Sequence, residues 1–168
     1  MTRPPAAARS AACCMALLLA ACATPQRIAA PIQPGDVLRT GRLALSVQDQ
    51  PGQSFSAGFE LRGQPASGEL TLLSPVGSTI AVLRWRPGSA VLEAQGRKPQ
   101  QFDSLDAMVE SATGAVVPVA ALFDWLAGVA TPVPGWEPDL SGLPDGRVRA
   151  RRVEPPPVAD LRVVLDPS

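Results

Sequence analysis

Few side chains of this sequence are suited to catalysis. Its 168 residues include no His and no Tyr, which excludes His-based triads and removes the commonest metal ligands. Asp103 with Asp106 and Glu137 with Asp139 are carboxylate pairs close in sequence, but helix capping and solvation are the alternative roles at such positions. The sequence contains neither a Gly-rich phosphate loop nor a nucleophile elbow. We therefore expect no enzyme, no metal and no cofactor.

The residue with the most definite chemistry is Cys22, and that chemistry is lipidation. Arg3 and Arg9 precede an apolar run that is too short to span a bilayer as a mature helix. The run ends in Leu-Ala-Ala-Cys at positions 19–22, which resembles the lipobox of bacterial lipoproteins. We predict that residues 1–21 are a lipoprotein signal peptide and that Cys22 carries diacylglycerol and palmitate as the first mature residue. An ordinary secretory signal, with Cys22 incidental, is the alternative.

Lipidation at Cys22 predicts a membrane-tethered protein without an internal disulfide, because Cys13 and Cys14 leave with the signal peptide. Ala23 rather than Asp follows Cys22, a pattern that resembles lipoproteins released to the outer membrane in enteric bacteria. Residues 22–36 contain three prolines and no periodicity, so we predict an extended tether of about 3.1 Å per residue. Residues 37–168 are predicted to form one domain on the periplasmic face of the outer membrane.

Most of this domain is predicted to be β-strand. Apolar and polar residues alternate in residues 41–47, where Leu43, Leu45 and Val47 share one face, and again in residues 55–61. Two apolar runs within residues 68–85 flank a Pro- and Gly-containing turn and predict a β-hairpin. Consecutive strands joined by tight turns predict an antiparallel meander with one face to bury. Further strands are predicted at residues 90–95, near Phe102, at 147–153 and at 159–165, whereas residues 131–146 are rich in Pro and Gly and predict a loop.

Two short helices are predicted within this series of strands. Asp103 or Ser104 can cap a helix with apolar residues at i, i+3, i+4 and i+7, and Gly114 ends it. A second stripe of that spacing begins after Pro118 and ends before Gly128. The inner face of the sheet is the only large apolar surface on which these helices can lie. We therefore predict a mainly β fold with a lid of short helices over the sheet.

Two features of this fold leave alternatives open. The space between sheet and helices is either an ordinary packed core or a cavity for an apolar ligand. At the tip of the central hairpin, Val76 lies between Pro75, which fixes its own φ angle, and Gly77, which permits a positive φ. Val76 either folds back onto its own hairpin or projects as an exposed apolar tip.

Four segments of the sequence share one further resemblance. They are the lipobox at 19–22, the first strand at 41–45, the hairpin segment at 73–79 and the run from 112 to 128. In this order they resemble LolB, a family of outer-membrane lipoprotein receptors, and they cover most of the predicted mature chain. The most specific segment is the Pro-apolar-Gly-Ser-Thr sequence of the hairpin.

This resemblance implies an open antiparallel half-barrel of the LolA/LolB-like kind, covered by a helical lid, whose apolar cavity holds acyl chains. It implies a monomer that accepts acylated lipoprotein cargo from the soluble periplasmic carrier LolA and inserts it into outer-membrane lipid. In the family an apolar tip residue, usually Leu, is needed for insertion, and Val76 occupies that position here. The candidates for the cavity lining are Phe59, Leu72, Leu83, Trp85, Leu122, Phe123 and Leu126.

The alternative function comes from a different class of protein. A ligand-free structural or assembly lipoprotein, tethered to the outer membrane, would have the same signal, tether and sheet around a solid core. A nucleic-acid partner is not expected for either function, because the formal net charge is zero.

Overall fold

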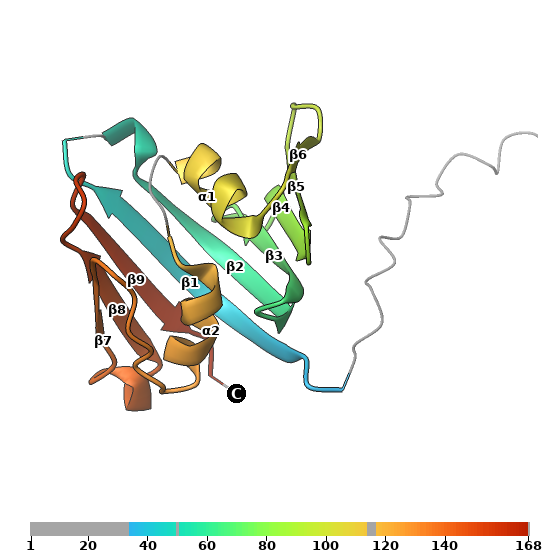
Figure 1. The fold of residues 1–168 in the computed structure, drawn as a ribbon. Helices are drawn as coiled ribbons and strands as arrows, with labels where there is room; N and C mark the ends of the chain where they lie inside the picture. Colours follow the sequence, from blue (N-terminus) through green and yellow to red (C-terminus); the bar gives the residue numbers. More distant parts are fainter. Residues whose placement is uncertain (1–33, 50, 114–116, 168) are drawn as a thin grey trace, which may run out of the picture. The chain divides into compact units, whose positions relative to one another are not determined.

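The computed structural model describes residues 34–49, 51–113 and 117–167, which form one nine-stranded antiparallel sheet and two α-helices (Figure 1). The predicted signal peptide, Cys22, most of the predicted tether and the helix stop at Gly114 lie outside the described residues. The strands are β1 (Val37–Val47), β2 (Phe55–Gln64), β3 (Ser67–Leu73), β4 (Thr79–Arg86), β5 (Ser89–Ala94), β6 (Gln100–Phe102), β7 (Trp136–Asp139), β8 (Arg147–Arg152) and β9 (Ala159–Leu165). The helices are α1 (Leu105–Thr113) and α2 (Val119–Leu126), with short 3-10 turns at Pro51–Gln53 and Leu143–Asp145.

The strand order is β6-β5-β4-β3-β2-β1-β9-β8-β7. The first six strands pair with their sequence neighbours, which confirms the predicted meander. The chain then forms both helices and returns to the free side of β1, where β9 pairs with it. Because β6 and β7 are the two edges, the sheet is open, and the architecture is consistent with an open half-barrel.

The predicted loop at residues 131–146 is wrong in its middle part. Residues 136–139 form β7, which pairs with β8 from Trp136 opposite Arg152 to Asp139 opposite Arg149. A strand with proline is tolerated at a sheet edge, where the missing N–H removes no ladder bond. The Pro and Gly residues of this segment, Pro138 among them, therefore led to the prediction of a loop where a short edge strand is present. β1 also begins earlier than predicted, at Val37 rather than Gly41.

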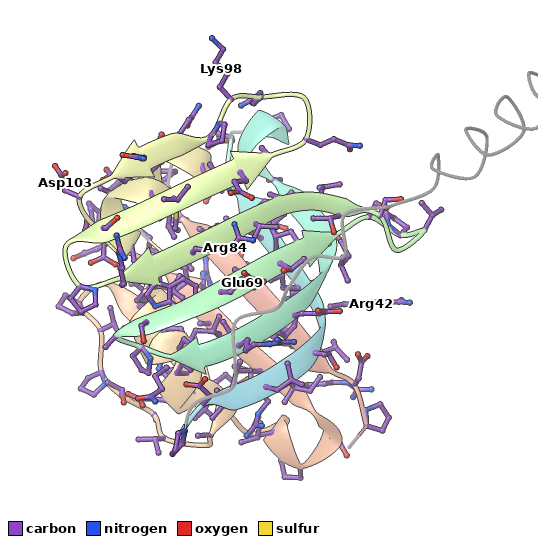
Figure 2. The ribbon with its side chains drawn as sticks, turned by 90° about the vertical axis from the view of Figure 1, so that its right-hand side faces the viewer. Arg42, Glu69, Arg84, Lys98 and Asp103 are labelled. Atoms are coloured by element: carbon purple, nitrogen blue, oxygen red, sulfur yellow. The ribbon has the colours of Figure 1, made fainter. Side chains whose placement is uncertain are left out.

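The inner face of the sheet carries most of the apolar core, and the described ion pairs lie on the outer face. The predicted alternation is confirmed in β1, where Leu43, Leu45 and Val47 are all buried. Both helices lie on this apolar inner face (Figure 1). On the outer face, Glu69 and Arg84 lie side by side on β3 and β4 (Figure 2).

Both helices begin and end where local chemistry favours it. Of the two predicted caps of α1, Ser104 is the one that acts, because its Oγ accepts a hydrogen bond from the Ala107 N–H at 3.1 Å. α2 starts after Pro118, which needs no intrahelical donor. After α2 the chain reaches Gly128 with φ of 85°, a conformation that glycine adopts readily.

Candidate functional site

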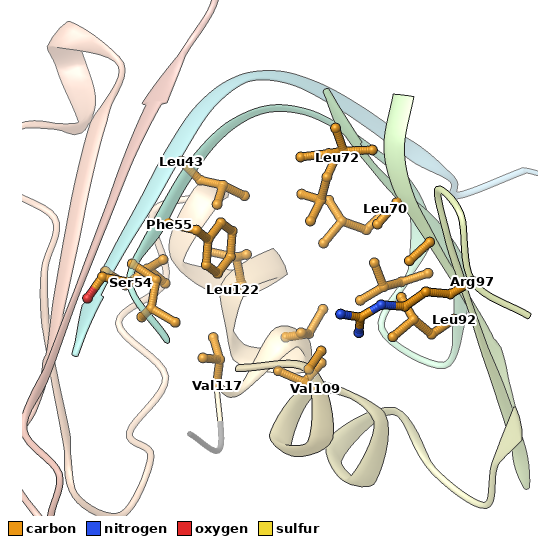
Figure 3. A pocket seen from close by; sticks show the side chains of 18 of the residues that line it. Leu43, Ser54, Phe55, Leu70, Leu72, Leu92, Arg97, Val109, Val117 and Leu122 are labelled. Atoms are coloured by element: carbon orange, nitrogen blue, oxygen red, sulfur yellow. The ribbon is translucent and has the colours of Figure 1, made fainter. Parts of the chain in front are cut away.

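An apolar cavity of about 350 Å³ lies between the inner face of the sheet and the two helices. Its size is at the small end of the range of typical ligand pockets. Figure 3 shows the open space, with Leu70 and Leu72 on the sheet side and Val109 and Val117 on the helix side. The lining comprises Leu43, Leu45, Gly52, Ser54, Phe55, Leu70, Leu72, Ile80, Ala81, Leu83, Leu92, Ala94, Arg97, Val109, Ala112, Val117, Val119, Leu122 and Leu161.

The structure brings three of the seven predicted lining residues to this cavity, namely Leu72, Leu83 and Leu122. The other four are buried in the adjoining core and do not line the hollow; they are Phe59, Trp85, Phe123 and Leu126.

Two of those core residues, Trp85 and Phe123, pack against each other. Trp85 meets Phe123 edge to face, with ring centroids 6.2 Å apart, and so joins β4 to α2. The Trp85 Nε1–H donates to the carbonyls of Gln64 at 3.3 Å and Pro65 at 3.0 Å. Because its polar atom has partners and its ring is packed, Trp85 fixes the sheet and helix on either side of the cavity.

Several lining residues were not among the predicted candidates. Leu43 and Leu45 of β1 line the cavity, and their shared face had been predicted from the alternation. Phe55 belongs to the equivalent pattern in β2 and lines it too. The signal that identifies these residues is the period of two, extended from the central hairpin to its neighbouring strands. Arg97, in the loop after β5, carries no such signal.

α2 is held in place by two tryptophans. Trp125 is fully buried, and its ring centroid lies 6.2 Å from that of Trp136 on β7. The Trp125 Nε1–H donates to the Thr131 carbonyl at 3.0 Å, and the Thr131 hydroxyl donates to Asp124 Oδ2 at 2.6 Å. These contacts anchor the C-terminal end of α2 to the segment that leads into β7, and they position Leu122 at the cavity.

The hairpin between β3 and β4 holds its tip residue away from the sheet. Ser74 and Ser78 close the loop, because the Ser74 N–H donates to the Ser78 carbonyl at 2.8 Å and the Gly77 N–H donates to the Ser74 carbonyl at 2.9 Å. Gly77 has φ of 83°, as the turn requires. Val76 is 87% exposed, so it projects and does not fold back onto the hairpin.

The two ionisable groups with shifted pKa values, Arg84 and Asp139, do not line the cavity. On the outer face of β4, burial lowers the pKa of Arg84, but hydrogen bonds and charge from Glu93 and Glu69 outweigh it and raise the pKa above its ordinary value. At the end of β7, hydrogen bonds from Ser141 lower the pKa of the exposed Asp139 carboxyl. Neither Arg84 nor Asp139 lines the cavity, so these two shifted pKa values do not affect what the cavity can bind.

The described residues contain neither a metal-ion cluster nor a membrane-spanning helix. No group of three His, Cys, Asp or Glu side chains among them is arranged to hold a metal ion. None of the helices in the described part of the chain has the length and apolar character needed to cross a membrane.

Comparison with known proteins identifies the family to which this chain belongs. A family model described as "Outer membrane lipoprotein LolB" matches residues 38–152, more than half of the chain. The chain belongs to the LolB family. LolB is not an enzyme family, in agreement with the expectation from the residue composition.

Curated relatives of the LolB family support this assignment, and each is named "Outer-membrane lipoprotein LolB". The protein of Bordetella petrii is 37% identical over 132 residues, which are 76% of this chain and 66% of the relative. That of Ralstonia nicotianae is 36% identical over 125 residues, 70% of this chain and 59% of the relative. That of Bordetella pertussis is 40% identical over 92 residues, 54% of this chain and 46% of the relative. The matched part of the chain thus spans less than two thirds of these relatives' length.

Proposed function

We propose that this protein receives acylated lipoproteins from a LolA-like periplasmic carrier and inserts them into the outer membrane. The observation that carries the proposal is the apolar cavity of about 350 Å³ between the inner face of the sheet and the helices. In this proposal the sheet is a LolA/LolB-like half-barrel, α1 and α2 are its lid, and the receptor works as a monomer. Cys22 holds it by lipid on the periplasmic face, with residues 22–36 as tether, 37–168 as receptor domain and residues 1–21 removed.

An apolar cavity suits this task because an acyl chain is expensive to expose to water. At about 0.8 kcal/mol per methylene, a chain of about sixteen carbons would cost on the order of 12 kcal/mol to move through water. Cargo must therefore pass from the cavity of a carrier to the cavity of a receptor and then to the bilayer. Most of the lining consists of Leu, Ile, Val, Ala and Phe side chains, which offer such a chain an apolar environment.

Val76 is the proposed inserting tip. A solvent-exposed valine at the end of a closed loop gains from contact with the acyl region of a bilayer, because its side chain is then removed from water. The loop is short and internally hydrogen-bonded, so it can enter the membrane surface without unfolding the sheet behind it. The cavity and the tip are then two separable parts, one for holding cargo and one for delivering it.

A reconstituted transfer assay tests the proposal. The chain from residue 22 onward, made soluble by Cys22→Ala, is mixed with an acylated lipoprotein loaded on its carrier and with liposomes. We expect cargo to appear first on this protein and then in the liposomes, because the cavity offers an intermediate apolar site. If cargo stays on the carrier and none is found on this protein, the receptor function is wrong and a ligand-free scaffold is the function to pursue.

A further inference from the structure

One charged side chain interrupts the otherwise apolar cavity. Arg97 lies in the loop between β5 and β6, and among the described residues that line the cavity it alone is charged. Figure 3 shows its guanidinium directed into the hollow, with Leu92 beside it. Arg97 is an exposed residue, so this cation lies at the open side of the cavity, in reach of both solvent and the apolar lining.

Backbone hydrogen bonds of the loop fix the position of the Arg97 main chain. The Arg97 N–H donates to the Ala94 carbonyl at 3.1 Å, and Gly96 has φ of 74°. A positive φ at the third residue of a four-residue turn is the signature of a type II turn, for which glycine is suited. The preceding Gln95 N–H donates to the Ile80 carbonyl at 3.0 Å and ties the loop to β4. The position of Arg97 at the cavity wall is therefore set by local hydrogen bonds.

Within the described part of the chain, the Arg97 guanidinium has no ion-pair partner. The described ion pairs both belong to Arg84 on the other face of the sheet, and Arg97 makes no side-chain hydrogen bond with a described residue. The other polar side chain of the lining is already used, because the Ser54 Oγ accepts a hydrogen bond from the Val47 N–H at 2.9 Å. Arg97 thus supplies the available donors of the cavity, and a guanidinium is a donor only.

We propose that Arg97 binds the head of an acyl ligand, namely a carbonyl or carboxylate oxygen at the end of the apolar chain. The chain lies along the Leu and Val lining while the oxygen accepts from the guanidinium, which fixes the direction in which the chain enters. This inference rests on the proposed function and adds to it the residue that recognises the acyl oxygen. An ester- or amide-linked acyl group and a free fatty acid share this chemistry.

Competition binding with and without an acyl oxygen tests the proposal. The soluble Cys22→Ala chain from residue 22 onward is saturated with diphenylhexatriene, a fluorescent probe that has no oxygen, and the probe is displaced by palmitate or methyl palmitate. In Arg97→Met the apolar stem of the side chain is kept and only the cation is lost. We expect probe affinity to stay the same and palmitate to bind about tenfold more weakly, as for the loss of a hydrogen bond to a charged group at an exposed site.

The two competitors and two further variants complete the design. A smaller loss for methyl palmitate, about threefold, would show that the ester carbonyl is also recognised, whereas a loss for palmitate alone would assign the site to free acids. Arg97→Lys should keep most of the palmitate affinity, because it keeps the charge. Arg86→Met removes an exposed arginine at the end of β4 that does not line the cavity, and should change nothing.

Three results would overturn the proposal about Arg97 while leaving the cavity intact. They are unchanged palmitate binding in Arg97→Met, an equal loss of palmitate and probe, or the same loss in Arg86→Met. Failure of the proposed function itself is distinguished by the transfer assay, in which cargo would stay on the carrier and none would be found on the parent protein.

Discussion

We expect a Val76→Glu variant to take up lipoprotein cargo normally and to fail to deliver it to membranes. The side chain at position 76 is 87% exposed at the tip of the β3–β4 loop, far enough from the core that the change does not disturb folding. A carboxylate in place of valine disfavours entry into the acyl region by about 3 kcal/mol at full depth. Even half of that difference corresponds to roughly tenfold slower delivery. The measurement is the transfer assay with separate readouts for cargo on the protein and cargo in liposomes.

Two control variants make this result specific. Val129→Glu makes the same change at another exposed valine, which lies after α2 and outside the hairpin, and should deliver cargo like the parent. Val76→Leu enlarges the apolar tip and should deliver at least as well. If Val76→Glu delivers normally, or if Val129→Glu fails equally, the hairpin tip is not the inserting element.

The second large effect is expected from filling the cavity. Ala81 is a small side chain on β4 that lines the cavity and lies opposite Leu72 of β3. Ala81→Trp places an indole in the space that an acyl chain would occupy, and β-strands accept aromatic residues well. We expect acyl-probe affinity and cargo uptake to fall by at least about tenfold, since each 1.4 kcal/mol of lost binding is a factor of ten. Thermal unfolding measured in parallel should show a folded protein.

The matched control is Ser56→Trp, which adds the same side chain to an exposed position on the outer face of β2. It should bind the acyl probe like the parent. Normal uptake by Ala81→Trp in a folded protein would contradict the cavity as the binding site. Loss of uptake in both tryptophan variants would point to a general effect of the added indole.

The elements of this fold were largely predictable because their signals are local. The period of two in β1 and β2 and the turn residues between β3 and β4 depend only on neighbouring positions, and so does the Ser104 cap of α1. β7 was not predicted because it is stabilised by pairing with β8, a contact that the local sequence does not show. Pro138 within it also argues against a strand when the sequence is considered alone. Trp136 explains why this edge strand stays in place, since it packs on Trp125.

The site was less predictable than the fold, for a physical reason. Periodicity indicates which side chains face inward, but whether they meet in a packed core or leave a hollow depends on how the sheet curves against the helices. Leu72 and Leu83 line the cavity, whereas Phe59 and Trp85 fill the core next to it, although all four lie on the same face of the sheet. Leu122 and Phe123 differ in the same way within the apolar stripe of α2. Arg97 could not be predicted in this way, because no periodicity shows whether an exposed loop arginine points toward a cavity or away from it.

The central claim is that the acyl chain of the cargo occupies the cavity under the sheet. It is tested most directly by loading the protein with a lipoprotein whose acyl chain carries a photoreactive diazirine, and by mapping the cross-links by mass spectrometry. The account predicts saturable cross-links to cavity-lining residues of β3, β4 and α2, including Leu72, Leu83 and Leu122. Cross-links confined to the outer face of the sheet or to the 74–78 loop, with none in the cavity, would contradict it.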